Sequence, residues 1–529
     1  MGLIACSGGT LLGHLFFRLD RMSRTRRLRQ QQKQAADQAK AVAAALPPVP
    51  RAQLWLAGAF LLPNLGALAC GFVLDDLPLI VENNSLHVRS LGQLAHIWAA
   101  GYWPDRSGQG LYRPVSQTVW ALTWAIGGGS HPWLFHALGL VLGLAVVLLL
   151  YRLLLDVRTP PRTAFIAALL FALFPIHAEA TTSAVGSAEL LGAAFGLGGL
   201  LFYYRNRPWP AVILFALAVF SKESAAAFAA LPLIFPRKDE RLQTRLVAAI
   251  GAAVTVAAAL VAHHFVSLHS FIPPIDNPIT LVDFGPRLLT ALWVQCLYLY
   301  KTVLPITLSA DYSYNQIRLV MGLADWRAWA GLALVGGALY LAWRERQFRA
   351  PALVYAVLFS SAANVLFPIG TIMGERLAYA PSLGLALLLA ILMAQSRYWK
   401  IVLVAVALLF GARTFVRNLD WLNADRFYTK LIQTSPNSAK SYYFYGALRS
   451  ARFDDTGAIE AYDRAIAIFP AYSEAYHNRG NALARLGRRE EAMASYRACL
   501  RFDPGHAGAA FNLRQLQAGL PVNPPRKRL

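Results

Sequence analysis

The feature that most constrains this chain is a series of apolar runs, most of them about as long as a membrane is thick. A helix needs roughly 20 apolar residues to cross 30 Å of hydrocarbon. Charged residues make up only 15% of the chain, against about 25% in an ordinary soluble domain. These properties predict an integral membrane protein and exclude a soluble multi-domain enzyme. The predicted spans are residues 52–73, 132–152, 162–177, 183–204, 208–220, 224–236, 245–266, 326–344, 351–368, 376–396 and 399–416.

The positive charge of the chain indicates topology. Lys and Arg exceed Asp and Glu by 50 − 28 = 22, and in a membrane protein such residues keep their connections in the cytoplasm and meet anionic lipid, so no nucleic-acid partner is expected. The arm at 1–51 carries nine of them and is placed inside. Eleven crossings then put the C-terminal region outside. This parity makes 287–305 a re-entrant or interfacial segment, and 114–126 is too short to span.

A 34-residue period begins after the last predicted span. Proline recurs at Pro436, Pro470 and Pro504, and alanine, tyrosine and glycine positions share the spacing. This is the tetratricopeptide period, in which small residues lie where paired helices touch and aromatic residues fill the groove. Two full repeats with a half repeat on each side are expected at 418–520, before a basic tail at 521–529. Such repeats bind a peptide or protein by default.

The predicted fold is therefore all-α. A polytopic helical bundle of about 11 spans occupies 52–417, and a tetratricopeptide α-solenoid follows it. The first outer loop is expected at 74–113.

Polar residues gather at the outer ends of the predicted spans, where they are costly unless they line a site. The adjacent carboxylates of Asp75 and Asp76 repel each other, which raises the pKa of at least one of them and suits it to act as a general base. A solvated loop that caps the next helix explains the two residues equally well. Arg113, Lys222 and Arg376, if they converge, would hold a phosphate. The other candidates are His177, Glu179, Glu223, Asp311 and Glu375.

Each of these candidates also has a structural interpretation. Lys222 with Glu223, and Glu375 with Arg376, are explained better by buried ion pairs that tie helices together, unless an anionic phosphate binds there. His177 is more often a satisfied interfacial histidine than a catalyst. The four cysteines form no C-x-x-C pair and are expected to be free thiols. No obligatory cofactor is expected, although the aspartate pair with Glu179 would suit a divalent ion in a variant mechanism.

The polar motifs, in order, resemble those of the transmembrane-and-tetratricopeptide (TMTC) proteins. The resemblance runs from about Leu54 to the end of the chain. Two departures stand out: the family often has arginine in the segment that is Gly186-Ser187-Ala188 here, and its repeat array is usually longer. The matching motifs are Phe72–Asn84, Tyr112–Val115, Phe174–Ala180 with Gly186–Leu190, Ser221–Glu223, Leu308–Ser313 and Phe367–Tyr379.

The resemblance implies a glycosyltransferase of the GT-C superfamily, similar to protein O-mannosyltransferases. Such enzymes move a sugar, with inversion, from a polyprenyl-phosphate carrier to an acceptor hydroxyl on the non-cytoplasmic face. The resemblance implies that Asp75 or Asp76 deprotonates the acceptor and that basic residues hold the leaving phosphate. The acceptor is expected to be a protein Ser or Thr, which the repeats engage directly or through a partner. The residues assigned to the donor are Arg113, His177, Glu179, Lys222, Glu223, Asp311, Glu375 and Arg376.

Two other function classes, a scaffold and a transporter, are alternatives to a glycosyltransferase. A non-enzymatic membrane scaffold would use only the repeats. A transporter needs polar groups near the middle of the membrane and paired halves, neither of which the sequence shows. The expected location is a bacterial inner membrane with the N-terminus in the cytoplasm and the repeats in the periplasm.

Overall fold

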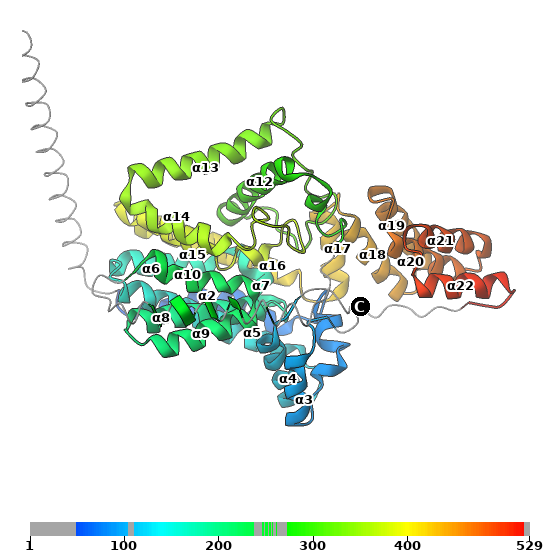
Figure 1. The fold of residues 1–529 in the computed structure, drawn as a ribbon, viewed down its shortest axis with the longest axis horizontal. Helices are drawn as coiled ribbons and strands as arrows, with labels where there is room; N and C mark the ends of the chain where they lie inside the picture. The colour runs from blue at the N-terminus through cyan, green and yellow to red at the C-terminus, as the bar shows by residue number, and fades with distance from the viewer. Residues whose placement is uncertain are drawn as a thin grey trace, which may run out of the picture.

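The structure, a computed structural model, describes residues 49–103, 111–236 and 272–522, with scattered positions between 246 and 261. The basic arm before residue 49, most of the predicted span at 245–266 and the tail after 522 lie outside these residues. Every regular element in the described part of the chain is a helix, which confirms the predicted all-α class. Figure 1 shows a helical bundle from which the C-terminal helices extend to one side.

The bundle packs around a helix that is buried on all sides. This helix is α6, Pro161–Leu173, and nearly all of its side chains are buried. Pro175 cannot continue the helical hydrogen bonding, so the chain bends by 50° before residues Pro175–Thr182. The helices that pack against it are α2 (Ala52–Asn64), α5 (Pro132–Asp156), α15 (Ser382–Gln395) and α16 (Trp399–Leu419). The bundle continues outward through α8 (Ser187–Tyr204), α9 (Pro208–Ser221), α10 (Ala226–Ile234) and α14 (Arg346–Phe359).

Three segments in the described residues are long and apolar enough to cross a membrane. They are Ala52–Ala69, Pro132–Asp156 and Trp399–Leu419, and the bent pair that begins at Pro161 makes a fourth if it is one span. Shorter apolar helices stand at several of the other predicted spans. The protein therefore has apolar membrane helices, while the number of eleven stays a prediction.

Two apolar segments, 287–305 and 114–126, were not predicted to span the membrane, and both are helical. All but the last two residues of 287–305 fall in α12, Phe284–Val303, which packs beside α13, Trp326–Arg344 (Figure 1). The predicted interfacial segment is α4, Pro114–Gly127, which begins at a proline and ends before Gly128 at φ 68°. Together with α3, Leu91–His96, α4 covers a small apolar core beside the main bundle.

The C-terminal helices form the predicted tetratricopeptide pairs. Gly446 and Gly480, one period apart, occupy equivalent close contacts: a Cβ would lie 2.8 Å from Cε1 of Tyr462 at the first and 2.6 Å from Cε1 of Tyr496 at the second. The period therefore reflects one packing solution used twice. The helices are α17 (Ala424–Thr434), α18 (Ala439–Ala451), α19 (Asp455–Ile468), α20 (Ser473–Arg485), α21 (Arg489–Phe502) and α22 (Ala507–Gln517).

The repeats pack directly against the bundle. The backbone N–H of Gly71, just after the first apolar segment, donates to the carbonyl of Leu422 at 3.1 Å. Val73 belongs to one apolar cluster with Trp421 and Phe427. The first predicted outer loop and the start of the solenoid therefore lie on the same side of the bundle.

Substitution of Gly446 by alanine tests the packing of the repeats. The added methyl must displace the buried Tyr462 ring, so Gly446→Ala should lower the free energy of unfolding by about 1–3 kcal/mol. Thermal unfolding of the purified full-length protein measures this change. Gly505→Ala is the matched control, because its Cβ meets only a carboxylate oxygen of Asp503 at 3.6 Å. Equal melting temperatures for the two variants would contradict the packing argument.

Candidate functional site

The adjacent aspartates after the first apolar segment have opposite surroundings. Leu74 has a φ of 53°, a left-handed conformation that is unfavourable for leucine, and its N–H donates to the Tyr428 hydroxyl of α17 at 3.2 Å. The side chain of Asp76 is buried, whereas that of Asp75 is 29% exposed. Of the two, Asp75 is the carboxylate that a substrate can reach.

Asp76 ties the first loop to the bundle. Its Oδ1 accepts hydrogen bonds from the Val185 N–H at 2.9 Å and from the Ser183 hydroxyl at 3.1 Å. Burial raises the pKa of Asp76 to about 6, against the lowering effect of these bonds. The residue therefore anchors the loop on the connection before α8.

Arg376 lies between two acidic side chains. Its guanidinium is 3.3 Å from Oδ2 of Asp75 and 3.5 Å from Oε1 of buried Glu179. The backbone N–H of Arg376 also donates to Glu179 Oε2 at 3.1 Å. Glu179 thus fixes both the main chain and the side chain of Arg376. The sequence suggested that Asp75, Asp76 and Glu179 would suit a divalent ion, but in the structure the Arg376 guanidinium lies between Asp75 and Glu179.

Arg113 and Lys222 form the two neighbouring ion pairs. Arg113 makes a bidentate contact with Glu223, at 2.8 and 2.5 Å, and its guanidinium lies 4.7 Å from the ring centre of Tyr102. Lys222 contacts Glu189 at 2.6 Å, and both side chains are 7% exposed. Arg113 and Lys222 are thus each paired with one carboxylate, whereas Arg376 contacts two.

Tyr102 connects these pairs to the aspartate. Burial raises its pKa to about 12, and the charges of Arg113, Asp75 and Arg376 all act on its hydroxyl. Of the three basic residues that the sequence singled out, Arg376 contacts Asp75 directly and Arg113 lies over the Tyr102 ring. Lys222 joins them through the charges of Arg113 and Arg376. Sequence reasoning missed Tyr102, because a lone tyrosine in a polar loop gives no signal.

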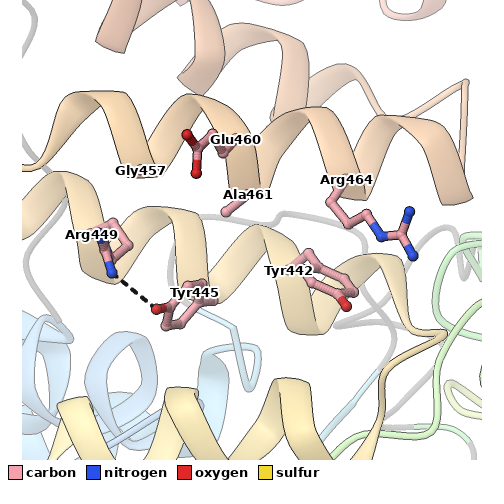
Figure 2. A pocket seen from close by; sticks show the side chains of 7 residues that line it. All are labelled: Tyr442, Tyr445, Arg449, Gly457, Glu460, Ala461 and Arg464. Atoms are coloured by element: carbon pink, nitrogen blue, oxygen red, sulfur yellow. Dashed lines mark hydrogen bonds between the residues drawn. The ribbon is translucent and has the colours of Figure 1, made fainter.

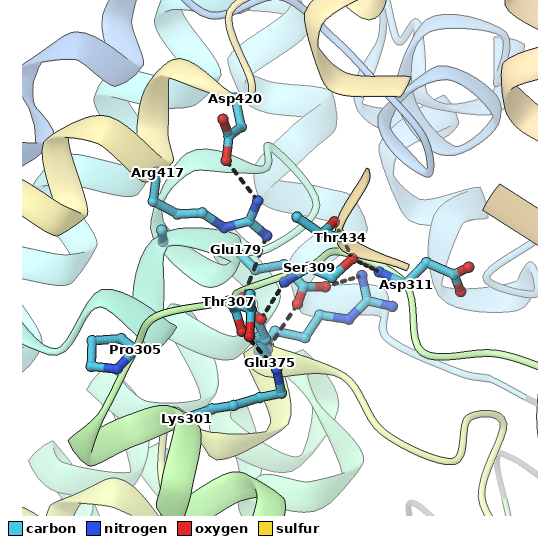
Figure 3. A network of polar contacts seen from close by, with 12 residues as sticks. Glu179, Lys301, Pro305, Thr307, Ser309, Asp311, Glu375, Arg417, Asp420 and Thr434 are labelled. Carbon is cyan, nitrogen blue, oxygen red and sulfur yellow. Dashed lines mark hydrogen bonds and ion pairs between the residues drawn. The ribbon is translucent and has the colours of Figure 1, made fainter. Parts of the chain in front are cut away.

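Glu375 belongs to a second, deeper network, shown in Figure 3. Its Oε2 lies 3.4 Å from Arg417 of α16, which also contacts Asp420 at 3.1 Å. Its Oε1 accepts from the Ser309 N–H and the Tyr312 hydroxyl, both at 2.6 Å. Arg417 was missed by the sequence reasoning, although an arginine near the end of an apolar run is a signal.

Asp311 and His177 contact other parts of the molecule. The Asp311 carboxylate accepts hydrogen bonds from the hydroxyls of Ser438 and Ser441, at the start of α18. His177 is buried, with Nε2 2.8 Å from the Ser382 hydroxyl and its ring against Phe171. These contacts match the structural interpretation of His177 and connect Asp311 to the repeats.

The repeats carry a separate groove on their first helix pair. It encloses about 310 Å³ between α18 and α19, and Figure 2 shows aromatic and charged side chains facing each other across it. The residues that line the groove are Tyr442, Tyr445, Arg449, Gly457, Glu460, Ala461 and Arg464.

Farther along the solenoid, the side chains of Glu474, His477 and His506 place three potential metal-ligand atoms within 4.8 Å of one another.

These features define a polytopic helical membrane protein in which an accessible carboxylate contacts a half-buried arginine, with two buried cations in the same region, joined to a tetratricopeptide solenoid. Comparison with known proteins shows what the chain is similar to. Residues 270–339 match the family described as "Protein O-mannosyl-transferase TMTC, DUF1736". Residues 454–487 and 473–506 match tetratricopeptide repeats.

Relatives that match most of the chain have the same description. The human "Protein O-mannosyl-transferase TMTC3" is 25% identical over 85% of this chain and 56% of its own length. The Caenorhabditis elegans "Protein O-mannosyl-transferase F38B6.6" is 26% identical over 78% of this chain and 62% of its own, and human TMTC4 is 25% identical over 74% and 63%. The chain thus spans little more than half the length of these relatives. The resemblance to the TMTC proteins is confirmed, and the chain is related to them over most of its length.

The buried position of Asp76 predicts a pH dependence of stability. Its folded-state pKa of about 6 exceeds the ordinary value of 3.8, so the folded protein binds this proton more tightly than the unfolded chain. The contribution of this proton to the free energy of unfolding is fully present below pH 3.8 and is lost as the pH rises through about 6. The loss should total about 3 kcal/mol.

Thermal unfolding between pH 4 and 7.5 measures this loss. Asp76→Asn keeps an acceptor for Ser183 and Val185 but removes the titration, so its stability should decline less over this range. Asp425→Asn, at the exposed surface of α17, is the control and should keep the wild-type slope. Equal slopes in wild type and Asp76→Asn would contradict the prediction.

Proposed function

We propose that the protein is an integral-membrane inverting glycosyltransferase of the GT-C type. It moves a sugar from a polyprenyl-phosphate donor to an acceptor hydroxyl, with a protein Ser or Thr as the acceptor and mannose as the sugar that the names of its relatives suggest. The observation that carries the proposal is the partly exposed carboxylate of Asp75 in contact with Arg376. The charges of Arg376 and Arg113 act together on Tyr102 and on Lys222, so two further cations adjoin this contact. An acid–base group next to a phosphate-binding cluster is what this reaction requires.

Asp75 is assigned as the general base. Both guanidinium contacts of Arg376 fall on its Oδ2, so we assign Oδ1 to the acceptor hydroxyl. The carboxylate takes the hydroxyl proton as the oxygen attacks the anomeric carbon, and the bond from that carbon to the phosphate oxygen breaks with its electron pair. Attack opposite the leaving group inverts the anomeric configuration.

The cationic cluster is assigned to the leaving phosphate. Arginine offers bidentate geometry to phosphate oxygens, and the charges of Arg376 and Arg113 both act on the Tyr102 hydroxyl. Glu223, which holds Arg113, is 52% exposed and can turn into solvent when a phosphate arrives. Lys222 adds a third charge, held in place by Glu189.

The repeats are assigned to the acceptor. They begin beside the proposed centre: the N–H of Leu74, the residue before Asp75, donates to the Tyr428 hydroxyl of α17 at 3.2 Å. A polypeptide on the solenoid would therefore lie close to Asp75. We place this face on the non-cytoplasmic side of a bacterial inner membrane, with the N-terminus in the cytoplasm.

The proposal is tested by replacing the assigned base. Asp75→Asn should lower sugar transfer from radiolabelled polyprenyl-phosphate donors about 10²- to 10⁴-fold, because a positioned base contributes about that factor. Arg376→Lys should also lower transfer, since lysine does not reproduce the bidentate contact. The assay uses the purified full-length protein in lipid with membrane extract as the acceptor source.

Asp425→Asn serves as the control for expression and folding and should transfer at the wild-type rate. Wild-type transfer by Asp75→Asn would sink the assignment of the base. If folded wild-type protein transfers no sugar from any donor in the panel, the enzyme proposal fails. The alternative is then a membrane-anchored scaffold, in which the groove on α18 and α19 binds the partner.

A further inference from the structure

The loop between α12 and α13, residues 304–325, connects the repeats to the segment that carries Arg376. Asp311 and Tyr312 are adjacent in this loop, yet their side chains bond to different parts of the molecule. Asp311 reaches α18, and Tyr312 reaches Glu375. Figure 3 shows Ser309 of this loop bonded both to Glu375 and to Thr434 at the end of α17.

On the repeat side, the loop is bound by the turn before α18. The Asp311 carboxylate accepts from Ser441 Oγ at 2.9 Å and from Ser438, the residue that caps α18. The Ser435 hydroxyl donates to the Asp311 carbonyl at 2.5 Å and lies 2.7 Å from the Ser309 hydroxyl. Several hydrogen bonds therefore join residues 309–311 of the loop to residues 435–441, and they hold the loop against the start of α18.

On the bundle side, the same loop holds Glu375. Tyr312 and the Ser309 N–H share Glu375 Oε1, and Arg417 contacts Oε2. Glu375 is fully buried, so each lost donor leaves an unsatisfied charged oxygen, which is costly. The position of Glu375 therefore depends on the loop.

Arg376 follows Glu375 directly, in the short helix η8, Glu375–Ala378. A shift of Glu375 would move the N–H and the guanidinium of Arg376 relative to Glu179 and Asp75. The contacts thus form a continuous path from Ser438 through Asp311, Tyr312 and Glu375 to Arg376.

We propose that Asp311 and Tyr312 are positioning residues, through which the docked repeats hold Arg376 beside Asp75. Neither residue touches the substrate. The inference rests on the proposed function, and it reassigns Asp311 and Glu375 from donor binding to the support of Arg376. An acceptor that binds the repeats would then meet a centre whose geometry the repeats themselves help to set.

A double-mutant cycle tests the path by activity. Tyr312→Phe removes one donor to Glu375 and should lower kcat about five- to tenfold, with the KM for the donor changed less than about twofold. In an Arg376→Lys background the same substitution should have less than about a twofold effect, because Arg376 is the residue through which Tyr312 acts. Equal effects of Tyr312→Phe in both backgrounds would overturn the proposal.

Hydrogen exchange tests the path without activity, so its outcome separates this inference from the proposed enzyme. In Asp311→Asn and Tyr312→Phe, amides in residues 371–380 should exchange at least about fivefold faster than in wild type. Gln316→Ala is the matched control: Gln316 accepts from the Asn437 N–H at 3.0 Å, so it joins the same loop to the repeats but does not hold Glu375. Unchanged exchange in Tyr312→Phe, or equal acceleration in Gln316→Ala, would overturn the path even in a protein that transfers no sugar.

Discussion

The buried carboxylate of Asp76 is the interaction on which the rest of the site depends. It accepts hydrogen bonds from the connection before α8, and in doing so it fixes a loop that begins immediately after an apolar helix. With Asp76 turned inward, the left-handed Leu74 and the short helix that follows turn Asp75 toward the cationic cluster. Two neighbouring residues of identical chemistry therefore take separate tasks, one in the fold and one at the surface.

The sequence allowed a good prediction of the helices and of the repeats. Apolar runs and prolines located α5, α13 and α16 to within a few residues, because hydrophobic length and helix-breaking residues act locally. The repeat period predicted the packing of Gly446 and Gly480, since each repeat solves the same contact. The number of spans was less predictable: helices such as α9 and α10 are too short to cross alone, and their place in a membrane depends on their neighbours.

The candidate site was predictable in its residue types and less so in its pairings. Some of the polar residues at span ends lie near Asp75, namely Arg376 and Glu179. Others, such as His177 and Asp311, have their partners elsewhere. The sequence suggested Lys222 with Glu223 and Glu375 with Arg376 as pairs, but adjacent residues in a turn point apart. Each partner instead comes from a distant helix: Glu189 for Lys222, Arg417 for Glu375. Such long-range pairings depend on tertiary packing, which a single sequence does not display.

The two cation pairs beside Asp75 differ in one property that determines how they respond to an anionic ligand. Glu223 is half exposed while its partner Arg113 is 9% exposed, whereas Lys222 and Glu189 are equally buried. A ligand that displaces Glu223 would exchange one anion for another, so the local net charge would stay constant and water would solvate the released carboxylate. The Lys222 pair would not exchange in this way, because its carboxylate is buried. The first pair would thus trade one anion for another, whereas the second would keep its own carboxylate as a fixed counter-charge.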